Sequence, residues 1–343
     1  MKAVVLHGVG NLRVETLPDP VPGPDEVVIR VAVCGICGTD LHIYQGQPGS
    51  AEVHPPVVLG HELAGEVLAV GTGVTKLRVG DRVSVDPNLY CGVCRFCRDG
   101  RIQMCEHLQA IGVTRNGGMA ELCVVPAKNC HRLPDGLGML EGALVEPLAC
   151  CVHGIERLSL RPGQSALVIG AGYIGLMMVQ LLRLYGAGHI VVSEPEARKR
   201  ELALSLGADS AINPNALPDH AAGVPAADAG TGFDVVIECV GRAETMHAAV
   251  EAAGRGGQIL LFGVANPDAV IQVRPYQVFA KELTIAGSFV NPYTHRAAVA
   301  LAAQGRIQMV PLVSHRFAPD DIPSVMECYR GLSALKGVIV WMQ

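Results

Sequence analysis

Four cysteines lie within fifteen residues of one another, at Cys91, Cys94, Cys97 and Cys105. Thiolates at this spacing can surround one metal ion only if the chain between them curls around it. Four sulfur donors in a tetrahedral shell are typical of a structural zinc site, which keeps no coordination position for a reactant. We therefore expect a lobe at about residues 88–108 that a zinc ion holds together.

A second set of metal-ligand types is dispersed along the chain, at Cys37, His61, Glu62 and Glu146. A thiolate, an imidazole and a carboxylate all bind zinc, and a catalytic zinc site uses three such ligands plus water or substrate. Each residue alone has an ordinary alternative, such as a buried thiol, a surface pair or a helix cap. Only their combination, beside the motif described next, favours a catalytic metal site.

A glycine-rich turn follows the apolar run that ends at Ile169. Its three glycines have the spacing that binds a dinucleotide: the first permits a tight turn, the second lets the pyrophosphate approach the backbone, and the third lets the helix pack on the strand. Free N–H groups at the start of the helix then favour the phosphates. The predicted cofactor-binding residues are Gly170, Gly172, Tyr173, Ile174 and Gly175.

Glu194 ends the next apolar run, at the distance where this motif places an acidic residue. A carboxylate there accepts hydrogen bonds from the ribose hydroxyls and repels a 2′-phosphate, which favours NAD over NADP. The basic run 198–200 on the following segment is the complication, because one of its side chains could reach a phosphate. We interpret that run as a solvated helix face and expect NAD.

Two kinds of element must position these residues. The first 150 residues contain short β-branched runs separated by Gly and Pro, which predict strands at 3–6, 26–33, 65–70 and 82–85. From residue 151 strands and helices alternate: strands at 166–169, 189–192, 234–238 and 258–262, and helices at 174–185, 196–206 and 243–253. This alternation predicts an α/β domain with a doubly wound parallel sheet. After residue 288 the pattern stops, with helices expected at 296–304 and 321–329 and a strand at 338–341.

Composition excludes several classes of function. The net charge of −5 disfavours a nucleic acid or an anionic membrane as the main partner. The start of the chain lacks the apolar run of a signal peptide. The uncharged stretch 165–182 is interrupted by three glycines, so we interpret it as a buried strand and helix rather than a membrane span. With no sign of secretion, the 12 cysteines indicate a cytoplasmic protein with metal sites rather than disulfides.

Across nearly its full length the chain resembles the zinc-containing medium-chain dehydrogenases. The matching motifs are 35–40 (Gly-Ile-Cys-Gly-Thr-Asp), 60–62 (Gly-His-Glu), the four-cysteine loop, 146–147 (Glu-Pro) and 170–175. Glu62 beside His61, and Glu-Pro-Leu at 146–148, are similar to the polyol (sorbitol and arabitol type), butanediol and threonine dehydrogenase branches.

The resemblance implies a GroES-like catalytic domain at 1–150 and 288–343, a Rossmann domain at 151–287, and an active site between them. It implies two zinc ions per subunit, with Cys37, His61 and Glu62 on the catalytic one and Glu146 binding it directly or through water. It also implies a homo-oligomer, most often a tetramer.

Two departures from the sorbitol-type pattern bear on the substrate. Sorbitol-type enzymes carry an Arg-Tyr pair after the last Rossmann strand, whereas the stretch 288–294 contains no arginine, which argues against sorbitol itself. The tripeptide 193–195 (Ser-Glu-Pro) is more similar to the butanediol and threonine branch. His54, Arg115 and Tyr293 are candidates for contact with the substrate.

The resulting hypothesis is oxidation of a secondary alcohol of a polyol or sugar alcohol to a ketone, by hydride transfer to NAD. Thr39 lies two residues after Cys37 and His42 three further on, so the pair could carry the released proton to solvent. A threonine 3-dehydrogenase or 2,3-butanediol dehydrogenase is the alternative enzyme. The non-enzymatic alternative is a zinc-stabilised nucleotide-binding protein, which has no need of the Cys37, His61 and Glu62 set.

Overall fold

The computed structural model describes residues 1–216 and 232–341. The chain divides into two compact units, Met1–Ala149 with Val290–Gln343, and Cys150–Phe289. The expected limits, at 150 and 288, differ from these by one and two residues. Helix α3 (Met139–Glu156), which the sequence did not predict, carries the chain from the first unit into the second and contains Pro147.

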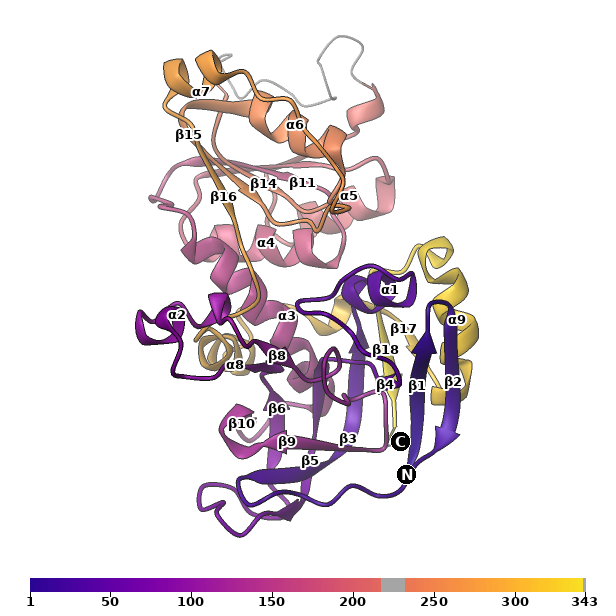
Figure 1. Cartoon of the computed structure of the whole chain (residues 1–343). Helices are drawn as coiled ribbons and strands as arrows, with labels where there is room; N and C mark the ends of the chain where they lie inside the picture. The colour runs from indigo at the N-terminus through magenta and orange to yellow at the C-terminus, as the bar shows by residue number, and fades with distance from the viewer. Residues whose placement is uncertain (217–231, 342–343) are drawn as a thin grey trace. The chain divides into compact units, whose positions relative to one another are not determined.

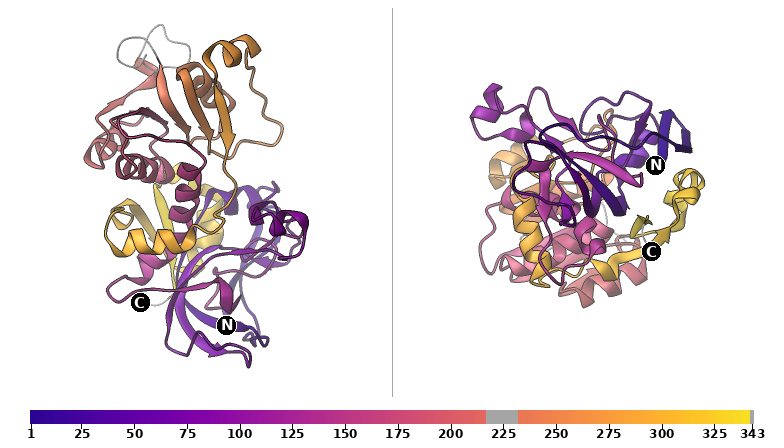
Figure 2. Two further views of the ribbon diagram at one scale, coloured as in Figure 1. Left: turned by 90° about the vertical axis from the view of Figure 1, so that its left-hand side faces the viewer. Right: turned by 90° about the horizontal axis from the view of Figure 1, so that it is seen from below.

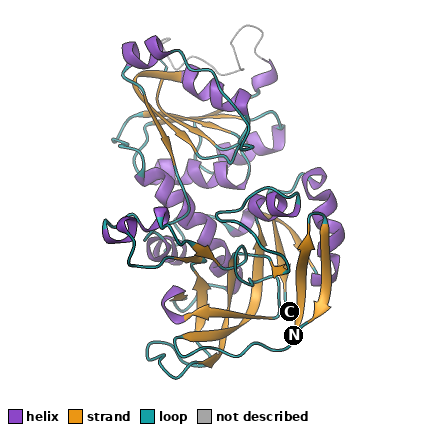
Figure 3. Ribbon diagram, viewed as in Figure 1, coloured by secondary structure: helices purple, strands orange, loops and turns teal. Residues whose placement is uncertain are grey.

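The first unit is built mainly from strands (Figures 1 and 3). A seven-stranded sheet has the order β10-β6-β5-β3-β18-β17, with β9 also paired to β3. Its strands are β3 (Glu26–Ile36), β5 (Glu62–Val70), β6 (Arg82–Val85), β9 (Leu122–Pro126), β10 (Cys130–Arg132), β17 (Val313–Phe317) and β18 (Lys336–Val340). Because β17 and β18 come from the last part of the chain, the first unit is discontinuous in sequence.

Two smaller sheets complete this unit. One has the order β2-β1-β4, from β1 (Lys2–Gly8), β2 (Asn11–Thr16) and β4 (Val57–Val58), and the other pairs β7 (Asn88–Leu89) with β8 (Gln109–Ala110). The helices are α1 (Gly38–Tyr44), α2 (Arg95–Arg98), α8 (His295–Ala303) and α9 (Ile322–Cys328). One apolar core joins the sheets and includes Ile29, Leu59, Leu63, Met119 and Ile339.

The second unit contains a six-stranded parallel sheet in the order β13-β12-β11-β14-β15-β16. Its strands are β11 (Ser165–Ile169), β12 (His189–Ser193), β13 (Ser210–Ile212), β14 (Phe233–Glu238), β15 (Ala253–Leu261) and β16 (Thr284–Gly287). The order runs outward in both directions from β11, which confirms the predicted doubly wound, Rossmann-like sheet.

Helices cover both faces of this sheet (Figure 2, left). They are α4 (Tyr173–Leu184), α5 (Ala197–Ser205), α6 (Ala243–Ala252) and α7 (Pro275–Lys281). Right-handed crossovers place α4 and α5 on one face and α6 and α7 on the other, because the chain winds away from β11 in opposite directions. The four inner strands β12, β11, β14 and β15 are therefore mostly apolar, which is why the sequence predicted them.

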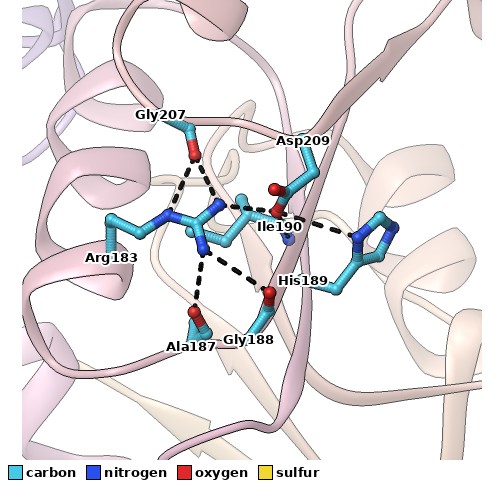
Figure 4. A network of polar contacts seen from close by, with 7 residues as sticks. All are labelled: Arg183, Ala187, Gly188, His189, Ile190, Gly207 and Asp209. Atoms are coloured by element: carbon cyan, nitrogen blue, oxygen red, sulfur yellow. Dashed lines mark hydrogen bonds and ion pairs between the residues drawn. The ribbon is translucent and has the colours of Figure 1, made fainter.

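One polar network fastens the end of this sheet that lies away from the glycine-rich turn (Figure 4). The Arg183 guanidinium donates hydrogen bonds to the carbonyl oxygens of Gly207 and Ala187, at 2.8 and 3.1 Å, and to Asp209 Oδ2 at 2.6 Å. The same Asp209 oxygen accepts a hydrogen bond from the N–H of Ile190 at the start of β12. The network joins the ends of α4 and α5 to the start of β12.

Among the described residues, no helix combines the length and the apolar character needed to cross a lipid bilayer. The run 165–182 forms strand β11 and most of helix α4 of the parallel sheet.

Candidate active site and cofactor site

The four-cysteine lobe is closed at its base by the pairing of β7 with β8, which brings Asn88 opposite Ala110. Within it the sulfurs of Cys91, Cys94, Cys97 and Cys105 lie within 4.8 Å of one another. Backbone N–H groups point at these sulfurs: for example, those of Cys94 and Val93 donate to Cys91 Sγ, and that of His107 donates to Cys105 Sγ. The set can hold one tetrahedral metal ion with no position left for a reactant.

Hydrogen bonding in the lobe favours thiolates. Bonds from the backbone N–H groups of residues 97 and 106 lower the pKa of Cys94 to about 6, and those of Val93 and Cys94 lower the pKa of Cys91. Burial has the opposite effect on Cys97 and raises the pKa of its thiol to about 12. Thiolates are the form that binds metal, so backbone hydrogen bonds favour that form at two of the four sulfurs.

The second ligand group consists of Cys37, His61 and Glu62, whose ligand atoms also lie within 4.8 Å of one another. Three elements bring them together. Cys37 caps helix α1, His61 precedes β5, and Glu62 is the first residue of β5, opposite Gly35 of β3. A Cβ atom at residue 35 would overlap Glu62 Oε2, so only glycine there lets the carboxylate lie over the strand.

Asp40 contacts two members of this group, Cys37 and His61. It is fully buried, accepts a hydrogen bond from the Cys37 N–H at 2.8 Å, and its Oδ1 lies 3.5 Å from His61 Nδ1. A carboxylate at one ring nitrogen of a histidine leaves the other nitrogen for a metal and raises its basicity. In the sequence analysis Asp40 is part of the motif 35–40 and has no predicted role.

The surroundings of His61 and Lys336 favour a cation. Burial alone would lower the pKa of each side chain, yet Asp40 and Cys37 raise the pKa of His61 well above its usual value. In the same way Glu62 and Cys37 raise the pKa of Lys336. A buried pocket in which nearby anions outweigh desolvation suits a divalent metal, so the residues present fit the zinc that the sequence predicted.

Glu146 lies on α3 and is buried, but it does not belong to the group of ligand atoms formed by Cys37, His61 and Glu62 among the described residues. Its assignment as a zinc ligand, directly or through water, therefore stays a prediction.

The glycine-rich turn has the geometry that a dinucleotide requires. Gly170 has a φ of +93°, in the left-handed region, and a Cβ at Gly175 would overlap the Gly170 carbonyl oxygen. Gly172 begins α4, and nothing lies within 4 Å of the place where its Cβ would be. Tyr173 and Ile174 form the first turn of α4, and backbone N–H groups at a helix N-terminus favour bound phosphates.

Glu194 follows β12 and is buried beside this turn. Its Oε2 accepts a hydrogen bond from the N–H of Ala171 at 2.8 Å, and its Oε1 accepts one from the N–H of Glu196 at 3.0 Å. Arg200 donates to the carbonyl oxygens of Glu194 and Pro195, while Lys199 pairs with Glu196. Two of the three basic residues at 198–200 thus bind their own loop.

Comparison with known proteins agrees with both features, the metal-ligand groups and the glycine-rich turn. A model of the alcohol dehydrogenase GroES-like domain matches residues 23–135, and a model of zinc-binding dehydrogenases matches residues 174–304. Sorbitol dehydrogenase of Bacillus subtilis (strain 168) is 33% identical over 95% of this chain and 93% of its own length. The chain belongs to the zinc-dependent alcohol dehydrogenase family. It is therefore an oxidoreductase, which disfavours the non-enzymatic alternative.

Two further relatives show how wide this family is. L-threonine 3-dehydrogenase of Edwardsiella ictaluri (strain 93-146) is also 33% identical, over 95% of each chain. The crystal structure of a zinc-binding dehydrogenase from Sinorhizobium meliloti 1021, bound to NADP, superposes with a TM-score of 0.94 at 38% identity, covering 99% of this chain and 98% of that one.

Lys336 is the residue of the dehydrogenase that sequence reasoning missed most clearly. It begins β18, it is 4% exposed, and its ammonium group pairs with Glu62. The predicted final strand began two residues later, at 338, which left Lys336 outside it. The available signal was a lysine directly before an apolar strand, a weak one because most such lysines reach solvent.

His54, Arg115 and Tyr293, the suggested substrate contacts of the dehydrogenase, lie in different surroundings. His54 and Arg115 line a separate cavity of about 350 Å³, and Arg115 donates to Glu26 at 2.7 Å. Tyr293 is 64% exposed, with a φ of +62°. A role of these residues in binding the substrate stays a prediction.

Proposed function

We propose that this dehydrogenase oxidises a secondary alcohol of a polyol or similar polyhydroxylated molecule to a ketone, with NAD as the hydride acceptor. The observation that carries the proposal is the convergence of Cys37, His61 and Glu62 in a pocket that favours a cation. Relatives named sorbitol dehydrogenase and D-arabinitol dehydrogenase support the choice of substrate class.

Two zinc ions per subunit are part of the proposal, one in the four-cysteine lobe and one at the Cys37 group. When bound at the latter, zinc would lower the pKa of a substrate hydroxyl by several units, and NAD would supply the redox chemistry. The chain's own part is to hold the ligands in place: the Asp40 carboxylate orients the His61 ring, and Gly35 makes room for Glu62.

Thr39 and His42 are proposed to carry the released proton. They lie three residues apart on α1, whose first residue follows the ligand Cys37, so both project from one face of the helix. The Thr39 N–H donates to Cys37 Sγ at 3.5 Å, which ties the start of the route to the ligand group. Histidine is the side chain whose unperturbed pKa lies near neutral pH, so this residue type suits the transfer of a proton to water.

NAD is proposed over NADP because the buried carboxylate of Glu194 stands beside the glycine turn, where a 2′-phosphate would meet a like charge. The relative from Sinorhizobium meliloti binds NADP, so the preference needs a direct measurement. Comparing kcat/KM for the two cofactors tests it, and a preference for NADP would overturn the role of Glu194.

We also infer a cytoplasmic homo-oligomer, with a tetramer favoured by the family resemblance. Support comes from the edge of the second unit, where Tyr276 and Phe279 of α7 are each 78% exposed and Ile285 of the edge strand β16 is 40% exposed. Large apolar side chains clustered at an unpaired sheet edge are typical of a covered surface. Light scattering coupled to size exclusion would give the subunit number.

A threonine 3-dehydrogenase or 2,3-butanediol dehydrogenase remains the second candidate. It is favoured by the glutamate at 194, by the lack of arginine in 288–294, and by the relative from Edwardsiella ictaluri.

One screen decides between these substrates. Polyols, vicinal diols and L-threonine are offered with NAD and with NADP while the absorbance of the reduced nicotinamide is followed. We expect the highest kcat/KM with a polyol and NAD. Turnover of threonine alone would replace the polyol, and no turnover of any alcohol by metal-loaded protein would refute the proposed function.

A further inference from the structure

Lys336 lies in the interior of the first unit, beside the catalytic ligand group. Strand β18 pairs antiparallel with β3, which sets Gly337 opposite Ile36. In this register the Lys336 ammonium donates to the Ile36 carbonyl oxygen at 3.0 Å and forms an ion pair with Glu62 Oε2. Both side chains of the pair are at most 5% exposed, so solvent does not screen it.

The Glu62 carboxylate is held from two sides. Gly35, opposite it on β3, leaves just enough space for Oε2, and Lys336 takes the same oxygen from β18. A carboxylate can bind a metal through one oxygen or through both. With Oε2 committed to Lys336, the group has its other oxygen, Oε1, to offer.

The charges of the pocket also indicate a role for Lys336. A bound zinc ion and the Lys336 ammonium would bring three positive charges, and the Cys37 thiolate with the buried carboxylates of Glu62 and Asp40 would bring three negative charges. Without the ammonium the pocket would carry one excess negative charge and would attract a cation more strongly. The carboxylate would also lose the partner that restrains its second oxygen.

We propose that Lys336 is a positioning residue that holds Glu62 to one-oxygen coordination and thereby keeps a position on the catalytic metal open for substrate. The inference rests on the proposed function, since it assigns a metal to the Cys37 group. It adds a specific role: a lysine from the last strand separates an open, catalytic site from a closed one.

The test replaces Lys336 by Met (K336M), which keeps the length and apolar stem of the side chain but removes the charge. The matched control is K281M, because Lys281 of α7 is also bonded to a backbone carbonyl oxygen, that of Ala253, but lies in the other unit. Wild type and both variants are loaded with Co²⁺, and the d–d absorption of the cobalt at the catalytic group is recorded. Zinc release to a chelator is then timed.

For K336M we expect the weaker d–d bands of a five-coordinate ion and roughly tenfold slower release of one zinc per subunit. We expect the K281M variant to match wild type. Restoring a cation with K336R should return the spectrum toward wild type, and in an E62Q background K336M should change nothing further. A purely structural lysine would show neither the spectral change nor its dependence on Glu62.

The outcomes separate the two proposals. If wild type takes up no metal at the Cys37 group, the proposed function fails. If it does, but K336M keeps the wild-type spectrum or releases zinc faster, the inference about Lys336 is wrong. Should K336M not fold, a crystal structure of zinc-loaded wild type decides: both Glu62 oxygens on the metal would overturn the inference, and one oxygen on the metal with the other on Lys336 would support it.

Discussion

The two metal-ligand groups of this molecule are built in opposite ways. The lobe takes four like donors from one stretch of fifteen residues and satisfies them with its own backbone N–H groups. The group at Cys37 takes three unlike donors from separate elements and surrounds them with two further buried charges, Asp40 and Lys336. The ligands of the lobe all come from one local segment. The Cys37 group forms only when β3, β5, α1 and β18 are all in place.

This difference gives the two groups different roles: the lobe contributes to stability, and the Cys37 group is suited to catalysis. A shell of four thiolates is complete, so its metal can only hold the lobe together. A shell of three ligands keeps a position open, and an open position in a buried pocket must be protected from the protein's own spare oxygens. This need explains why the Cys37 group has two further charged side chains around it. The four-cysteine lobe requires no such side chains.

The substitution Cys37→Ser should have the largest effect, because it removes a ligand of the Cys37 group alone. The catalytic group should lose its metal while the lobe keeps its own, so metal analysis should fall from two ions per subunit to one. Because a Lewis-acid metal stabilises the transition state by several kcal/mol, kcat/KM should fall about 10³-fold or more. Loss of both metals, or turnover near wild type, would contradict the division of roles.

Asp40→Asn tests the support beneath the catalytic group. The neutral amide leaves the geometry of α1 nearly intact but removes the charge facing His61 Nδ1, so affinity for zinc at this group should fall about 10- to 100-fold. Competition against a chelator of known affinity measures it. The lobe's zinc serves as the internal control and should be retained as in wild type.

His42→Ala tests the proton route without touching a ligand. We expect turnover to fall near neutral pH by about 10²-fold or less, because the histidine acts one step from the reacting hydroxyl. At high pH hydroxide can accept the proton directly, so part of the loss should be restored. A pH–rate profile parallel to that of wild type would dismiss the relay, and unchanged metal content is the control.

Cys97→Ser should have the smallest effect on turnover and the clearest effect on stability. The lobe should lose its metal and the first unit should unfold at a lower temperature, since metal binding contributes folding free energy. The protein that remains folded should keep its kcat within about twofold, as no reactant binds in a closed shell. A large fall in kcat at full folding would mean that the lobe takes part in the reaction.

The contrast also explains what the sequence could predict. The four cysteines and the glycine-rich turn are local patterns, and both were found with their geometry: a left-handed Gly170 and an open space at Gly172. The long apolar strands β11 and β14 were predicted because both faces are buried. Cys37, His61 and Glu62 were combined from their donor types beside the glycine motif, and the family resemblance then assigned them to one catalytic zinc.

What the sequence missed depends on distant partners. Whether a lysine is buried is decided by the anion it meets, and Lys336 meets Glu62 only through the pairing of β18 with β3. Helix α3 was missed because Pro147 interrupts its pattern, although the structure accommodates it. The edge strands β13 and β16 are short and half exposed, so they lack the apolar run by which their neighbours were predicted.

The pairing of β18 with β3 has a consequence for biosynthesis. Lys336 binds the carbonyl oxygen of a residue that is 300 positions earlier in the chain. A ribosome that adds about 5–20 residues each second exposes Glu62 many seconds before its partner exists. During that interval the nascent chain has the Glu62 carboxylate without the ammonium that pairs with it in the folded protein. The buried ion pair can therefore form only after nearly the whole chain has been made.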